Sequence, residues 1–353
     1  MGSCCLASWL RSRRPRPLRE ERLSANHFDL DVVATRGDAI ESRHRVHAVV
    51  SSAEGDLLGS AGDPAFPTVW RSCAKPFQLF SFVESGGFDA CGWGSEELAI
   101  ACASHGGEPE HVELAARMLE SIGLEEGDLA CGAHEPMTRR GVRLMHQAGL
   151  TPTRLHNNCS GKHAGMLAFA RGQSWSTLGY ERLGHQVQDR ALAQIAKWSG
   201  SPRDDMQLTV DGCGVVAVGL PLTALALAFA RLGAAADRGE EVPARIIAAI
   251  SAHPFLFGGT DRFDTVLVEE TGGRLISKVG AEGVHAVSIP AERIAVAIKV
   301  EDGATRAQHP ALLKLLQRLR VLPDELSPRL AAFAHTPILN TRNELVGEVR
   351  VAS

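Results

Sequence analysis

The chain has few aromatic residues and no long apolar run, and each shortage excludes a class of function. Aromatic side chains make up 5% of the 353 residues, with Tyr180 as the single tyrosine, so the stacking platforms that bind single-stranded nucleic acid are not expected. A net charge of −4 gives no electrostatic reason to bind nucleic acid or an anionic membrane. The richest apolar run, residues 219–230, is too short to span a membrane and predicts a buried helix.

The cysteines lack the paired spacing of a small secreted protein or of a zinc finger. In a chain of this length, scattered cysteines predict reduced thiols and therefore a cytoplasmic protein, with some of the thiols free to act as ligands. The sequence contains eight of them: Cys4, Cys5, Cys73, Cys91, Cys102, Cys131, Cys159 and Cys213.

The first 27 residues differ in texture from the rest of the chain. Met-Gly and two cysteines precede an arginine-rich stretch, 11–22, whereas a secretory signal has its charges first and its apolar core after them. Lipidation of this end is one reading. We favour a disordered extension or a misassigned start, and we expect residues 28–353 to form a single unit of one domain or two closely packed subdomains.

Hydrophobic periodicity predicts an α+β protein. Strands are expected within 28–52 and 56–62, at 266–275, 286–290 and 294–298, and near the C-terminus at 344–351. Helical spacing predicts helices at 75–85, 95–104, 110–122, 181–198, 220–232, 244–251 and 310–320. We therefore expect a sheet built from both chain ends around a helical middle region.

The first chemical motif is Ser72-Cys73-Ala74-Lys75. A serine and a lysine three residues apart at the start of a helix share one face, where a neutral amine could activate the hydroxyl as a nucleophile. The same spacing opens the catalytic helix of serine β-lactamases. The competing interpretation is a serine that caps the helix and a lysine in solvent.

Two further segments could place catalytic groups beside this pair. Residues 102–111 present Ser104 and His105 at the end of a predicted helix, although a capped loop with hydrated charges explains the pattern equally well. Lys278 ends a strand before a glycine-bearing turn, so it could face a cleft or point into solvent.

Two cysteines lie on tight turns of small residues. Cys159 stands in His156–Met166, which runs into an apolar helix, and Cys213 stands between two glycines. Such turns suit a tetrahedral thiolate metal site. Two buried structural cysteines would produce the same pattern.

Taken together, these segments resemble the asparaginase II family, the serine–lysine, zinc-binding L-asparaginases. The similarity runs in order from about Asp31 to the C-terminus and is most specific in Asn157-Asn158-Cys159-Ser160-Gly161-Lys162-His163. The other matching segments are Arg71–Pro76, Ala103–Pro109, Cys131–Pro136, Asp211–Gly214 and Lys278–Gly283.

The resemblance implies a serine β-lactamase/glutaminase-like fold and hydrolysis of L-asparagine to L-aspartate and ammonia. It implies two serine–lysine pairs, Ser72 with Lys75 and Ser104 with Lys278, and a homodimer. It also implies a zinc ion, which positions substrate, and its ligands Cys159, Lys162 and Cys213. We add Arg71, His163 and Asp211 as expected substrate-binding residues.

Two alternatives come from different classes of function. One is another serine–lysine amidohydrolase, a glutaminase or a β-lactamase-like acyl enzyme, although the Ser-Asp-Asn and Lys-Thr-Gly motifs of β-lactamases are absent. The other is a non-catalytic ligand-binding relative, which predicts the loss of a nucleophile or a base, whereas both serines and both lysines are present.

Overall fold

The computed structural model describes residues 26–352. The predicted N-terminal extension lies outside this range except for its last two residues. These two form the edge strand β1 (Asn26–His27), which pairs in parallel with β5 (Leu57–Ala61).

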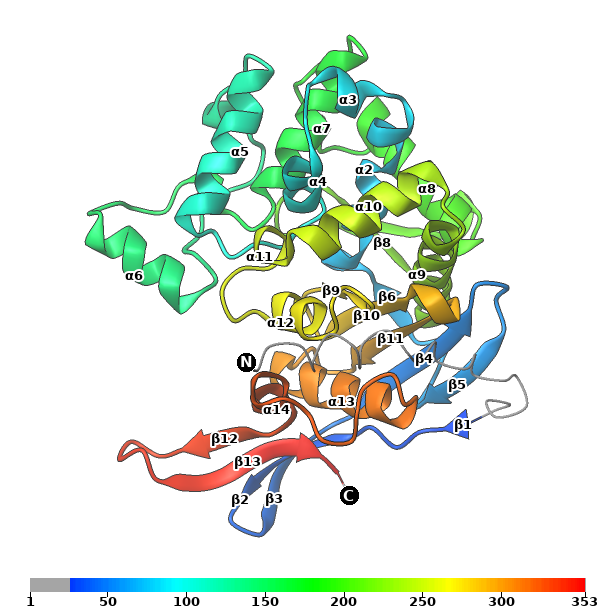
Figure 1. The fold of residues 1–353 in the computed structure, drawn as a ribbon, viewed down its shortest axis with the longest axis vertical. Helices are drawn as coiled ribbons and strands as arrows, with labels where there is room; N and C mark the ends of the chain where they lie inside the picture. Colours follow the sequence, from blue (N-terminus) through cyan, green and yellow to red (C-terminus); the bar gives the residue numbers. More distant parts are fainter. Residues whose placement is uncertain (1–25, 353) are drawn as a thin grey trace, which may run out of the picture.

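The main sheet has six strands and combines segments from both ends of the chain (Figure 1). Its order is β1, β5, β4 (Val46–Ser52), β11 (Ile294–Val300), β10 (Val284–Ile289) and β9 (Ile276–Val279). All neighbours except β1 and β5 are antiparallel. This arrangement confirms the predicted α+β fold class, with a sheet built from both chain ends around a helical middle region.

Side-chain alternation along the central strands gives the sheet two buried faces. On β11, Ala295 and Ala297 belong to one core, whereas Val296 and Ile298 belong to the other. Successive side chains on a strand point to opposite faces, so each core lies on its own side. The apolar helix α9 (Leu222–Asp237) covers the alanine face, and α13 (Thr305–Arg318) covers the other.

Two smaller sheets complete the strand structure. Near the chain ends, β12 (Thr336–Leu339), β13 (Leu345–Val351), β2 (Val32–Arg36) and β3 (Ala39–His44) form an antiparallel sheet that extends from the body in Figure 1. Beside the helical region, β6 (Pro67–Val69), β8 (Val216–Pro221) and β7 (Gln207–Val210) form a three-stranded sheet that leads into the first catalytic motif.

The middle of the chain forms a helical layer on the α9 side of the sheet (Figure 1). Its helices are α2 (Lys75–Glu84), α3 (Gly87–Ala90), α4 (Ser95–Ala101), α5 (Pro109–Ser121), α6 (Arg139–Gln147), α7 (Ser160–Gly172), α8 (Gln186–Ser199) and α10 (Glu241–Ala252). Helix α7 is buried along nearly all its length because it packs against α2, α4 and α5.

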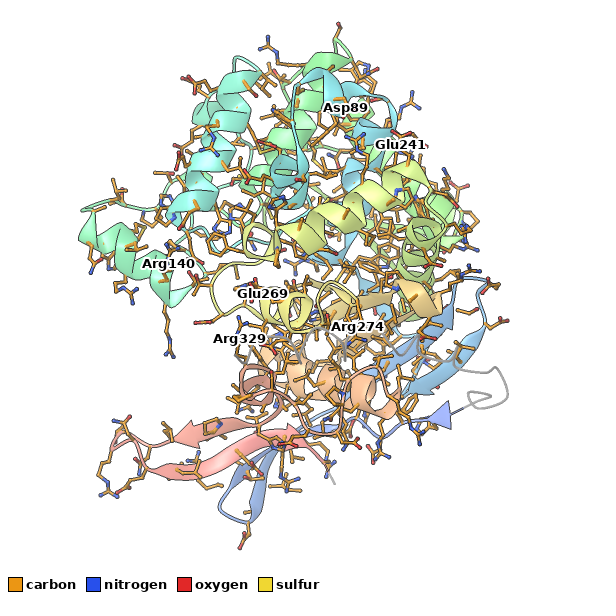
Figure 2. All side chains as sticks on the ribbon, viewed as in Figure 1. Asp89, Arg140, Glu241, Glu269, Arg274 and Arg329 are labelled. Carbon is orange, nitrogen blue, oxygen red and sulfur yellow. The ribbon has the colours of Figure 1, made fainter. Side chains whose placement is uncertain are left out.

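Helices α11 (Pro254–Phe257) and α12 (Phe263–Glu270) lie at the junction of the helical layer and the sheet, and α14 (Pro328–Ala334) packs against α12 and α13. Arg329 of α14 pairs with Glu269 of α12 at 2.8 Å, and both residues are labelled in Figure 2. This ion pair ties together two helices whose side chains line the cavity described below.

One element prediction is wrong. The segment 266–275 is not a strand, because its first part belongs to helix α12 and its remainder is a turn before β9. Its three consecutive buried apolar residues, Val266, Leu267 and Val268, are compatible with a helix or a strand, so their neighbours in the fold decide the conformation. The region 28–52 also contains three strands where we expected two.

Candidate active site

Ser72 lies where β6 passes into the helical layer. A short 3-10 helix, Arg71–Ala74, precedes α2, and Arg71 adopts a left-handed backbone conformation with φ of 48°. A non-glycine residue rarely adopts that conformation, and such strain is often found at functional sites. Ser72 itself is half-buried and lines a cavity.

Lys75 points into the interior from the first residue of α2. Its side chain is 1% exposed. The amine Nζ donates hydrogen bonds to the backbone oxygen of Ala103, to Ser104 Oγ at 3.1 Å and to the backbone oxygen of Asn158 at 3.2 Å. Within the described residues, none of its hydrogen bonds goes to Ser72, the partner that the sequence predicts.

Ser104 also accepts a hydrogen bond from a second lysine, which lies on a strand distant in the sequence. Lys278 lies on β9, is fully buried, and donates from Nζ to Ser104 Oγ at 2.7 Å and to the Val279 backbone oxygen at 2.7 Å. The two residues are 174 positions apart in the sequence. Ser104 and Lys278 are thus within hydrogen-bonding distance, as expected for the second serine–lysine pair. Lys75 is hydrogen-bonded to the same hydroxyl.

The surroundings of Lys278 favour its neutral form. Burial, together with the nearby charge of Lys75, lowers the pKa of Lys278 to about 8, although the buried carboxylate of Asp264 partly opposes the shift. Asp264 is itself occupied, because it accepts hydrogen bonds from Ser277 and from the Val279 backbone N–H, and it pairs with His285. An amine with a pKa near 8 can accept a proton near neutral pH.

Both serines open onto one cavity of about 500 Å³ between the helical layer and the sheet. This volume lies in the usual range for small-molecule sites. Among the residues that line it are Ser72, Ser104, Asn158, Arg262, Val279 and Glu282.

The predicted metal ligands lie together beside this cavity. Lys162 Nζ is 3.0 Å from Cys213 Sγ, and all three of Cys159, Lys162 and Cys213 are buried. Cys159 interacts with Cys213 and also donates to Asn158 Oδ1 at 3.3 Å. The backbone oxygen of Asn158 accepts from Lys75, so one asparagine joins the cysteine cluster to the lysine–serine cluster.

Charge is shared unequally within the cysteine cluster. The hydrogen bond with Cys159 lowers the pKa of Cys213 to about 4, with help from the Lys162 charge and against the effect of burial. That hydrogen bond and burial raise the pKa of Cys159 to about 12. Burial disfavours the charge on Lys162, but the facing sulfurs outweigh it and raise the pKa of its amine.

This donor set fits zinc by its chemistry, since two thiols and one amine around one point leave a fourth tetrahedral position open. Across residues 26–352, no group of three or more His, Cys, Asp or Glu side chains is arranged to hold a metal ion. A metal at this place therefore needs the lysine amine as its third ligand.

The three expected substrate-binding residues surround the cysteine cluster and are not among the residues that line the serine cavity. Arg71 Nε donates to Asp211 Oδ1 at 2.8 Å, so these two residues neutralise each other. His163 is fully buried and its Nδ1 lies 2.6 Å from the Tyr180 hydroxyl. Burial lowers the pKa of His163 to about 3, which keeps its ring neutral.

The sequence reasoning did not single out Arg262, which lines the serine cavity. It follows Gly258-Gly259-Thr260-Asp261 and precedes α12. A charged residue between a glycine turn and the start of a helix was the available signal. It was missed because 266–275 was predicted to be a strand.

The L-asparaginase II family model matches residues 32–351. The chain belongs to the L-asparaginase II family. This match covers nearly all of the described fold, including both serines, both lysines and both cysteines of the site. Family membership supports amide hydrolysis as the class of reaction.

Solved structures of a protein named Mglu are similar to this chain at low identity. Mglu in its glutamate form is 15% identical with a TM-score of 0.44, over 80% of this chain and 63% of that one. Another Mglu structure is 15% identical with a TM-score of 0.43, over 80% and 69%. The chain thus spans somewhat less than two thirds of the first of these proteins. No curated protein matches the chain significantly.

Helices of the described region are too short or too polar to cross a membrane.

Proposed function

We propose that this chain is an L-asparaginase that hydrolyses L-asparagine to L-aspartate and ammonia through a serine activated by lysine. One observation carries the proposal. Two buried lysine amines converge on Ser104 Oγ, in a cavity that Ser72 also lines. Buried lysines beside serines match the acyl-transfer chemistry of an activated nucleophile, and the family supplies the amide substrate.

In the proposed reaction, a serine oxygen attacks the side-chain carbonyl carbon of asparagine while a neutral lysine takes the hydroxyl proton. The carbon–nitrogen bond then breaks, and the lysine returns the proton to the leaving nitrogen, which departs as ammonia. Water hydrolyses the resulting ester, with the same lysine acting as base. Aspartate leaves and the serine hydroxyl is restored.

We assign the attack to Ser72, because it is the more exposed of the two serines and faces the cavity. Ser104 is 3% exposed and accepts from both lysines, so it suits a proton relay between them. The contacts of Ser104 also make it the alternative nucleophile, and single substitutions of the two serines distinguish the roles.

We propose that Cys159, Lys162 and Cys213 hold zinc. When bound, the ion would supply an electrophilic position for a polar group of the substrate. The chain's own groups orient this cluster: Arg71 pairs with Asp211, and the Cys159 thiol donates to Asn158 beside the serine cavity. A homodimer and a cytoplasmic location also remain proposals, which rest on the family resemblance and on the cysteine pattern.

Ammonia release from L-asparagine and L-glutamine tests the proposed activity directly. We expect release from asparagine with a clear preference over glutamine. Equal or greater release from glutamine would support the glutaminase alternative. Release from neither amide by well-folded protein would favour the non-catalytic alternative.

A further inference from the structure

Among the described residues that line the cavity shared by Ser72 and Ser104, Arg262 is the only lysine or arginine. Lys75 and Lys278 donate their hydrogen bonds to Ser104 Oγ and to backbone oxygens. Arg71, the arginine nearest to Ser72 in sequence, is paired with Asp211. The cavity therefore contains one guanidinium whose role the proposed reaction does not explain.

Within residues 26–352, the Arg262 side chain makes no hydrogen bond and no ion pair, and the carboxylates of Asp264 and Glu108 act on it only through their charge. A guanidinium carries five N–H donors and cannot lose its charge in a protein, so the half-buried Arg262 keeps these donors free for an acceptor on a ligand. Its charge acts on Lys278 and on His105, which places it close to the catalytic groups. An acceptor supplied by a ligand would satisfy these donors.

A second polar group on the same cavity also lacks a partner. His309 lines the cavity with its ring stacked on Phe263, at 4.3 Å between ring centroids, and its buried Nε2 has no hydrogen-bond partner. The carboxylates of Asp261 and Glu282 line the cavity as well. The cavity therefore presents both signs of charge, as a zwitterionic ligand requires.

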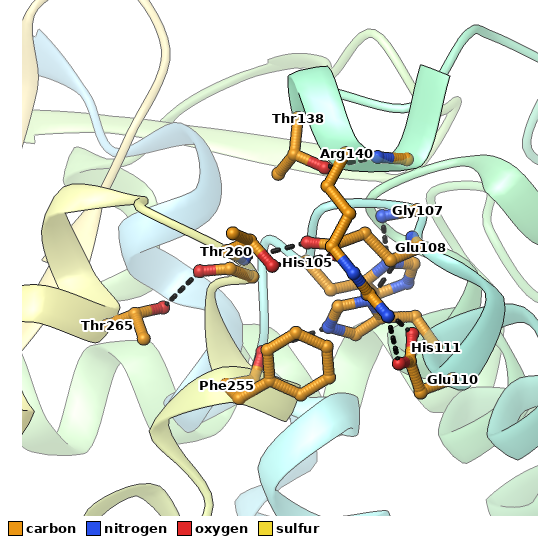
Figure 3. Close-up of polar contacts among 12 residues, drawn as sticks. His105, Gly107, Glu108, Glu110, His111, Thr138, Arg140, Phe255, Thr260 and Thr265 are labelled. Carbon is orange, nitrogen blue, oxygen red and sulfur yellow. Dashed lines mark hydrogen bonds and ion pairs between the residues drawn. The ribbon is translucent and has the colours of Figure 1, made fainter. Parts of the chain in front are cut away.

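Thr260, two residues before Arg262, is hydrogen-bonded to Glu108, four residues after Ser104 (Figure 3). Glu108 is fully buried and accepts from the Thr260 backbone N–H at 2.7 Å and from the Thr260 hydroxyl at 2.8 Å. Arg140 donates to the same carboxylate, and Thr265 Oγ1 donates to the Gly259 backbone oxygen at 2.8 Å. These contacts fix the position of the Arg262 backbone relative to Ser104.

We propose that Arg262 binds the α-carboxylate of the substrate and thereby restricts the enzyme to amides of free α-amino acids. This inference rests on the proposed function and adds the group that selects the substrate. A guanidinium can hold a carboxylate through two parallel N–H···O bonds, which fix orientation as well as charge. Anchoring that end of the molecule would direct the side-chain amide toward the serines.

The test compares two substrates that differ only in the α-carboxylate: L-asparagine and 3-aminopropanamide, which keeps the amide and the amine. In the wild-type protein, we expect kcat/KM to be far higher for asparagine. In Arg262→Gln, kcat/KM for asparagine should fall roughly 10- to 100-fold, as expected for losing charged hydrogen bonds, while 3-aminopropanamide hydrolysis stays unchanged. Arg262→Lys keeps the charge but loses the two parallel N–H donors. Its kcat/KM for asparagine should lie between those of the wild type and Arg262→Gln.

Arg143→Gln is the matched control, because Arg143 is exposed and lies in the neighbouring surface hollow rather than in the serine cavity. Equal losses in both glutamine variants, or an unchanged preference in Arg262→Gln, would overturn the proposal while leaving the asparaginase activity in place.

A binding measurement separates this inference from the proposed activity, since it needs no turnover. By calorimetry, L-aspartate should bind the wild-type protein. Its Kd for Arg262→Gln should be at least about tenfold higher. If wild-type protein hydrolyses no amide yet shows this difference, the proposed function fails and the carboxylate site stands. Equal binding to both proteins, or no binding to the wild type, overturns the carboxylate site.

Discussion

Ser104 is the residue on which the two buried lysines of the site converge, and this contact pattern differs from the two separate pairs expected from the sequence. Lys75 and Lys278 approach its hydroxyl at 3.1 and 2.7 Å. The three groups therefore form one hydrogen-bonded unit, in which a change at one member alters the protonation of the others.

Replacing Ser72 tests its role as the acylated nucleophile. We expect Ser72→Ala to lower kcat for asparagine at least about a thousandfold, because no other group would form the acyl ester, while circular dichroism stays native. Ser104→Ala should leave measurable turnover. The reverse ranking of the two variants would assign acylation to Ser104.

The pH dependence of activity tests Lys278 as a base. Its pKa is lowered to about 8, so its amine is charged below that pH and neutral above it. We expect kcat/KM to rise by about tenfold per pH unit up to pH 8 and then to level off. Lys278→Arg, which stays charged, should be inactive throughout, whereas Lys197→Met, at a 60% exposed side chain, should keep the wild-type profile. A flat wild-type profile from pH 6 to 9 would rule out this base.

At the scale of elements, the junction between α5, α6 and the loop before α12 depends on one buried carboxylate. Burial favours the neutral form of Glu108, but Arg140 and Thr260 outweigh it and lower the pKa of this residue. Glu108 also begins α5 by donating its backbone N–H to His111 Nδ1 at 3.2 Å (Figure 3). The loop carrying Ser104 and the loop carrying Arg262 are thus joined through a single side chain.

Removing that carboxylate should destabilise the protein. We expect Glu108→Ala to lower the free energy of unfolding by about 2–4 kcal/mol, because it leaves the partly buried Thr260 donors without an acceptor and breaks the ion pair with Arg140. Urea denaturation measures this change. The control is Glu113→Ala on the same helix, whose ion pair with Arg117 is exposed and should contribute less than about 1 kcal/mol. Equal effects of the two variants would contradict the proposed role of Glu108 in joining the two loops.

For the whole molecule, the cysteine cluster predicts the metal content. We expect about one zinc per chain by elemental analysis of protein purified without chelator. Cys159→Ala and Cys213→Ala should each lose the metal and bind asparagine more weakly. Cys91→Ala is the control, since Cys91 lies near α3 and its thiol donates to the Gly87 backbone oxygen. Full activity without bound metal would leave only the serine–lysine chemistry.

The fold class followed from the sequence because strand and helix periods alternate in blocks along the chain. The apolar run that forms α9 and the paired strands β10 and β11 were identifiable in this way. Helix α12 was not, because its consecutive apolar residues Val266, Leu267 and Val268 are compatible with either conformation. Helix α6 was also not predicted from the sequence, because it is a polar helix that buries only Gly141 and Met145.

By itself, the sequence determined which chemical groups are available: two serines, two lysines and two turn cysteines in motifs specific enough to indicate a family. The tertiary structure decided how they pair. Lys75 and Lys278 reach one hydroxyl, Arg71 is occupied by Asp211, and Arg262 faces the cavity unpaired. Spacing along the chain fixes only which neighbours share a helix face. Contacts between residues 174 positions apart depend on how the sheet and the helical layer pack.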